Sequence, residues 1–123
     1  MTFLAVVEGE ADGWHVDRDA LTEAILARWA EVAIDASHRS EVRSLTWVFD
    51  TENGPGEAYL HEGGTCLFMD VGKGDAIWLT IAFRRLTPRH LGLVFCDEGY
   101  TFDVRLPTGT IEAELTALVN AAG

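Results

Sequence analysis

Two stretches of the chain carry apolar residues at helical spacing. The first runs from Arg18 to Asp35, directly after Asp17, a residue type that often caps helices. Its apolar positions recur every three or four residues and form one stripe: Leu21, Ala24, Ile25, Trp29, Val32 and Ala33. The second runs from Thr110 to Ala122, after Pro107, and has a similar stripe. The pattern predicts a longer helix in the N-terminal half and a shorter helix at the C-terminus.

The other apolar segments are short and separated by glycine-containing turns, which is typical of antiparallel strands. The opening run, Phe3 to Val7, is apolar throughout and predicts a strand buried on both faces. Six further runs are predicted as strands: Val42 to Phe49, Glu57 to His61, Cys66 to Asp70, Ala76 to Phe83, Leu91 to Cys96 and Tyr100 to Leu106. The clearest alternation lies in the run from Ala76 to Phe83, where every second residue is large and apolar.

These elements predict an α+β fold: an antiparallel meander sheet of six to seven strands, with both helices packed on one face. The other face of the sheet is expected to be partly solvated, because the last run alternates apolar and polar residues. A length of 123 residues suits a single hydrophobic core, and no linker or repeat divides the chain. Residues 1–123 are therefore predicted to form one domain.

The charge balance narrows the classes of partner. With 9 Lys and Arg against 20 Asp and Glu, the formal net charge is −11, which repels nucleic acid. No apolar run is long enough to cross a bilayer, and the first residues lack the basic flank of a secretory signal. Cys66 and Cys96 lie inside apolar runs and are predicted to be free thiols. We expect a cytoplasmic protein that binds neither nucleic acid nor membrane.

The common catalytic motifs are absent from the sequence, including phosphate-binding glycine loops and the nucleophile elbow. This favours a non-enzymatic protein without a cofactor. The one compact group of metal-ligand residue types is His61, Glu62 and Cys66. Because Cys66 begins an apolar run, a core thiol beside a surface histidine is the favoured interpretation, and no metal site is predicted.

Carboxylates gather at one end of the predicted sheet. In a meander, the turns at 51–56, 71–74 and 97–99 share an end. The acidic residues expected there are Asp50, Glu52, Glu57, Asp70, Asp75, Asp97 and Glu98, with Lys73 as the counter-charge. Such a rim predicts docking to a basic protein partner by a monomer or homodimer, as immunity proteins and antitoxin-like inhibitors do. The simpler alternative is that acids occupy solvated turns.

The connection at the opposite end is rich in arginine. It contains Arg84, Arg85, Arg89 and His90. These residues suggest an alternative function, a small-ligand or enzymatic domain that grips an anion or phosphate. The competing interpretation is that the arginine stems cover the sheet edge while their charged ends stay in water. Trp14, in the loop before the first helix, is either an exposed interface anchor or a side chain packed over the helix start.

Overall fold

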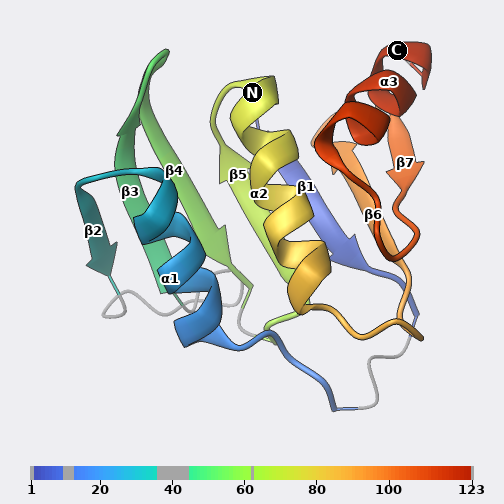
Figure 1. Ribbon diagram of the computed structural model, residues 1–123, viewed down its shortest axis with the longest axis horizontal. Helices are drawn as coiled ribbons and strands as arrows, with labels where there is room; N and C mark the ends of the chain where they lie inside the picture. The colour runs from blue at the N-terminus through green and yellow to red at the C-terminus, as the bar shows by residue number, and fades with distance from the viewer. Residues whose placement is uncertain (1, 10–12, 36–44, 62, 123) are drawn as a thin grey trace.

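The antiparallel sheet has an order that a simple meander does not produce. The computed structural model describes residues 2–9, 13–35, 45–61 and 63–122, and within them seven strands form one sheet in the order β2-β3-β4-β5-β1-β6-β7 (Figure 1). The strands are β1 (Thr2–Val7), β2 (Val32–Asp35), β3 (Leu45–Thr51), β4 (Gly54–Leu60), β5 (Cys66–Asp70), β6 (Leu93–Asp97) and β7 (Asp103–Arg105). The described helices are α1 (Arg18–Arg28), α2 (Lys73–Leu86) and α3 (Glu112–Ala122).

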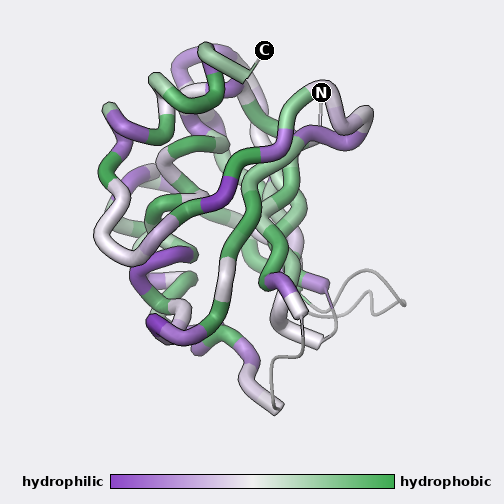
Figure 2. Tube along the Cα trace, turned by 90° about the vertical axis from the view of Figure 1, so that its right-hand side faces the viewer, coloured by the Kyte–Doolittle hydropathy of each residue, from purple (hydrophilic) through white to green (hydrophobic). Residues whose placement is uncertain are grey.

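All three helices cover the same face of the sheet, and Figure 2 shows the two layers from the side. Alternate residues of the strands are buried against the helices, as Phe3, Ala5 and Val7 are in β1. The indole of Trp47 is fully buried, and its Nε1 donates a hydrogen bond to Thr22 Oγ1 at 2.9 Å, which joins β3 to α1. The prediction of helices packed on one face is confirmed.

The opposite face of the sheet carries no helix among the described residues. Leu4 and Val6 of β1 are half-buried on this face, whereas Val48 of β3 is 42% exposed. Tyr59 and Phe68 stack on this face with their ring centroids 4.8 Å apart. Neighbouring side chains on the pleated surface therefore shield one another, and this face is partly solvated as expected.

The first helix is shorter than predicted. It ends at Arg28, and Trp29 already has extended backbone angles (φ −122°, ψ 135°). Residues 32–35 form strand β2 at the edge of the sheet, where Val32 lies opposite Phe49 and Ile34 opposite Trp47. β-branched residues suit a strand, so the helical spacing of Val32 and Ala33 with the residues before them was not evidence of helix.

The run from Ala76 to Phe83, predicted as a strand, belongs to α2 instead. Seven of its eight residues, all except Trp78, are buried, because α2 is the middle helix of the layer, with α1 and α3 on either side and the sheet beneath it. Alternation distinguishes strand from helix only where one face is polar, and here nearly every position is buried. Gly72 and Gly74, predicted to form a hairpin turn, lie at the start of this helix without positive φ.

The position of β1 breaks the meander. β1 pairs with β5 on one side and β6 on the other, so the N-terminal strand lies inside the sheet. Strand β5 has the predicted bounds, Cys66–Asp70, whereas other strands differ at their ends. β4 begins at Gly54, β6 spans Leu93–Asp97, and only Asp103–Arg105 of the last predicted run is a strand. Residues 42–44 of another predicted strand lie outside the described residues, and the strand itself is β3.

Candidate binding surface at the acidic end of the sheet

The strand registers bring the ends of β3, β5 and β6 to one end of the sheet. Glu57 of β4 lies opposite Asp70, Asp70 lies opposite Thr2, and Phe3 lies opposite Asp97. Asp75 is in the first turn of α2, which starts at this same end directly after β5. The predicted acidic residues therefore lie together at this acidic end: Asp50, Glu52, Glu57, Asp70, Asp75, Asp97 and Glu98.

These carboxylates differ in their availability to a partner. Asp97 is 1% exposed and accepts hydrogen bonds from the hydroxyl and the backbone N–H of Thr101. The hydroxyl bond is the main reason that the pKa of Asp97 is lowered. Asp97 thus holds the turn between β6 and β7. Asp50, Glu52, Asp70 and Glu98 are exposed, and Glu57 is half-buried.

A pocket of about 310 Å³ lies within the acidic end, and we call it the acidic pocket. Its lining residues are Arg28, Trp29, Asp50, Glu52, Asn53 and Asp75. The structure gives Asp50 and Glu52 no ion pair with another described residue. Two of the three carboxylates that line the pocket are therefore available to a cation.

Arg28 shows how this pocket accommodates a guanidinium group. Its Nη2 lies 3.6 Å from Oδ1 of Asp75. Its guanidinium carbon lies 5.2 Å from the ring centroid of Trp78 and 5.8 Å from that of Trp29, within the range of cation–π attraction. Trp29 is held in turn by stacking on Phe49 at 4.0 Å. Aromatic rings and a carboxylate together bind one arginine of the chain itself.

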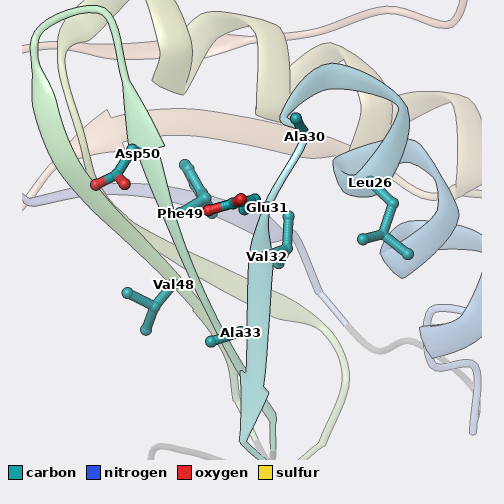
Figure 3. A pocket seen from close by; sticks show the side chains of 8 residues that line it. All are labelled: Leu26, Ala30, Glu31, Val32, Ala33, Val48, Phe49 and Asp50. Carbon is teal, nitrogen blue, oxygen red and sulfur yellow. The ribbon is translucent and has the colours of Figure 1, made fainter.

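An apolar groove adjoins the acidic pocket at the edge of the sheet, and we call it the edge groove (Figure 3). It has a volume of about 620 Å³ and is lined by Leu26, Ala30, Glu31, Val32, Ala33, Val48, Phe49 and Asp50. Leu26 from α1 and Val48 from β3 are 46% and 42% exposed. Asp50 lines both hollows, so the acidic pocket and the edge groove form one continuous surface.

The edge groove could not be expected from a first helix that was predicted to continue through Asp35. In that arrangement residues 30–33 would be helical and could not form a wall beside β3. The available signal was the β-branched pair Val32 and Ile34 after a helix that ends in Arg28.

Trp14 is half-buried and contacts Phe83 edge-on, with ring centroids 6.4 Å apart. It also lines a hollow beside Asp17 and Arg18 at the start of α1. Trp14 therefore packs against α2 near the start of α1, in agreement with the simpler of its two interpretations.

The group His61, Glu62 and Cys66, for which no metal site was predicted, cannot be followed as a whole, because Glu62 lies outside the described residues. In the part that the structure describes, no group of three His, Cys, Asp or Glu could hold a metal ion. Nδ1 of His61 accepts a hydrogen bond from the N–H of Gly63 at 3.1 Å. Cys66 and Cys96 are free thiols on β5 and β6, the two strands that flank β1, and burial raises the pKa of both.

The arginine-rich connection has two parts. Arg84 and Arg85 belong to the last turn of α2, whereas Arg89 and His90 follow the helix and are exposed. The guanidinium of Arg84 is buried rather than wet, which corrects the interpretation that all these charged ends lie in water. This group lies at the end of α2 opposite to the acidic pocket.

Within the described residues, no helix is long and apolar enough to span a bilayer. Comparisons with protein-family models, with curated proteins and with solved structures found no match to this chain.

Proposed function

We propose that this protein binds a basic protein partner through the acidic pocket and the edge groove. The observation that carries the proposal is the arrangement of Arg28, which shows that the pocket binds a guanidinium while Asp50 and Glu52 remain available. An arginine or lysine of a partner would complete the neutralisation of these carboxylates.

The edge groove adds apolar contact area to the acidic pocket. Stable interfaces combine an apolar, often aromatic centre with a polar rim. Here Leu26, Val48 and Phe49 provide apolar area, and Glu31 and Asp50 border it. The surface therefore suits a partner segment that carries basic and apolar side chains side by side.

The class of partner follows from charge. A net charge of −11 with exposed carboxylates at one end attracts proteins whose own functional surface is positive, and it speeds their association at low salt. Proteins that act on nucleic acid have such surfaces. Inhibition by covering that surface, in the manner of an immunity or antitoxin-like protein, is the role we propose.

A defined basic probe tests this proposal without knowledge of the natural partner. The probe is an immobilised synthetic peptide of arginine and leucine, and surface plasmon resonance measures association at low and high salt. We expect the Asp50→Asn/Glu52→Gln variant to associate about fivefold more slowly in low salt, and the difference to vanish near ~0.5 M salt.

The matched control is Glu23→Gln/Glu112→Gln, which removes the same charge from exposed positions on α1 and α3. We expect this control to associate at nearly the unmodified rate. Leu26→Ser should weaken binding by faster dissociation, with little dependence on salt, because it removes apolar contact area. Equal effects of the two double variants would show that net charge alone attracts the probe and would overturn the proposed surface.

A further inference from the structure

A second pocket lies at the other end of α2, and it is independent of the proposed protein-binding surface. It has a volume of about 450 Å³ and lies between the C-terminal end of α2 and the turn that precedes α3. We call it the arginine pocket. The lining residues that matter here are Arg84, Arg85, Arg89, Thr108, Gly109 and Thr110.

Arg84 is a buried cation without an acidic partner among the residues that the structure describes. It is 4% exposed, and its Nη1 donates to the carbonyl oxygen of Leu91 at 2.7 Å. Its Nη2 donates to Thr108 Oγ1 at 2.7 Å and, more weakly, to the carbonyl oxygen of Pro88 at 3.4 Å. Nε is buried and has no hydrogen-bond partner in the structure as described. All three acceptors are neutral, so no carboxylate in the described part of the chain bonds to Arg84.

The hydrogen bonds of Arg84 tie the end of α2 to Pro88, Leu91 and Thr108, but they supply no negative charge. Burial of an uncompensated charge is costly. Desolvation accordingly lowers the pKa of Arg84. Two further arginines line the same pocket, although like charges repel one another. An anion in the pocket would offset both the cost of burying the charge of Arg84 and the repulsion between the arginines.

The turn before α3 adds neutral donors to the arginines. The Thr108 hydroxyl accepts from Arg84 and keeps its own hydrogen to donate, whereas the Thr110 hydroxyl already donates to the carbonyl oxygen of Pro107 at 2.7 Å. Gly109 has a positive φ of 87° with open space around it. The start of α3 is partly occupied by its own side chain, since Glu114 Oε1 accepts the N–H of Ile111 at 3.2 Å. The attraction for an anion therefore comes mainly from the arginines rather than from the helix N-terminus.

We propose that the arginine pocket binds an organic phosphate monoester. A phosphate dianion can accept bonds from several guanidinium groups at once, which a single carboxylate does less well. The pocket falls within the size range of small-molecule sites and is much larger than a bare ion requires. Pro88 and the half-exposed Ile111 provide an apolar wall for the organic part.

The test uses the full chain and three probes: phenyl phosphate, inorganic phosphate and benzoate. Isothermal titration measures affinity, and amide chemical shifts of Gly109 and Thr110 report the location. We expect saturable binding of phenyl phosphate below ~1 mM, weaker binding of inorganic phosphate, and binding of benzoate at least about tenfold weaker than phenyl phosphate. Benzoate binding equal to that of phenyl phosphate would overturn the assignment to phosphate.

Variants at exposed arginines keep the test independent of folding. Arg85→Gln and Arg89→Gln should each weaken phenyl phosphate binding by about fivefold to tenfold. The control Arg105→Gln removes an exposed arginine on β7 that does not line the pocket and should leave binding unchanged. No saturable binding up to about 10 mM, or an equal loss in the control, would refute the site. Neither result would affect the peptide test of the acidic pocket.

Discussion

The hydrogen bond between Trp47 and Thr22 gives a direct test of how α1 is attached to the sheet. Thr22→Val removes the hydroxyl acceptor but keeps the shape and the β-branched character of the side chain. The Trp47 indole is fully buried, so its N–H would be left without a partner that water can replace. An unsatisfied buried donor costs about 1–3 kcal/mol of unfolding free energy.

The expected shift in melting temperature follows from the size of the chain. For 123 residues, the unfolding entropy is about 260 cal/mol/K, so a loss of about 2 kcal/mol lowers the melting temperature by about 8 °C. Urea unfolding followed by circular dichroism measures the free energy, and a thermal scan measures the temperature. Both methods should rank the variants in the same order.

A double-mutant cycle with Trp47→Phe isolates the bond. Thr22 Oγ1 also donates to the carbonyl oxygen of Arg18 at 2.8 Å, and Thr22→Val removes this bond in both backgrounds. Trp47→Phe removes the indole N–H that would otherwise lose its partner. In that background, Thr22→Val should therefore lower the free energy of unfolding by about 1 kcal/mol less than it does in the unmodified protein. An equal cost in both backgrounds would refute the placement of α1 over β3, and with it the position of Arg28 in the acidic pocket.

Three further predictions concern single positions. The lowered pKa of Asp97 means that its contribution to stability is present above the unfolded pKa of about 4 and is lost as pH falls through the folded pKa. The melting temperatures of Asp97→Asn and the unmodified protein should therefore differ at neutral pH and converge as the pH is lowered below the folded pKa. Gly64→Ala should lower the free energy of unfolding, measured in urea, by about 1–3 kcal/mol, because Gly64 has φ +72° and an added Cβ would lie 2.7 Å from the Cβ of His15. Gly109→Ala should lower it by less, because Gly109 has φ +87° but open space around it. Burial, with a smaller effect of Cys96, raises the pKa of Cys66 to about 12, so alkylation at pH ~8 should be about a thousandfold slower than in the unfolded chain; rapid labelling of Cys66 in the native protein would contradict this.

Two elements were predictable from the sequence for different reasons. The C-terminal helix follows its pattern because water on one side and core on the other impose a period on the residues. Strand β5 was predicted as a short apolar run bounded by glycine turns, and it has the predicted bounds. Helix α2 was not predictable in this way. It is buried nearly all round, so Ile77, Leu79, Ile81 and Phe83 fit the strand and the helix period equally well.

The acidic end was located correctly although one of its elements was assigned wrongly. Residues 76–83 carry the chain from the acidic end to the arginine-rich end whether they form a strand or a helix. The strands after them therefore keep their direction, and Asp97 and Glu98 still reach the same end as Asp70. Residue spacing could not reveal that Asp97 is buried or that Asp75 pairs with Arg28, because both depend on contacts between distant segments.

The insertion of β1 between β5 and β6 has a consequence for biosynthesis. β1 is an apolar strand that is synthesised before both of its neighbours, residues 66–70 and 93–97. It can pair on one side only after residues 66–70 have been made, and on the other only after residues 93–97. Loops of this length close slowly, so the nascent chain exposes an apolar strand while the segments between are synthesised. We expect binding of a chaperone to this strand to influence yield more than any stabilising change in the finished core.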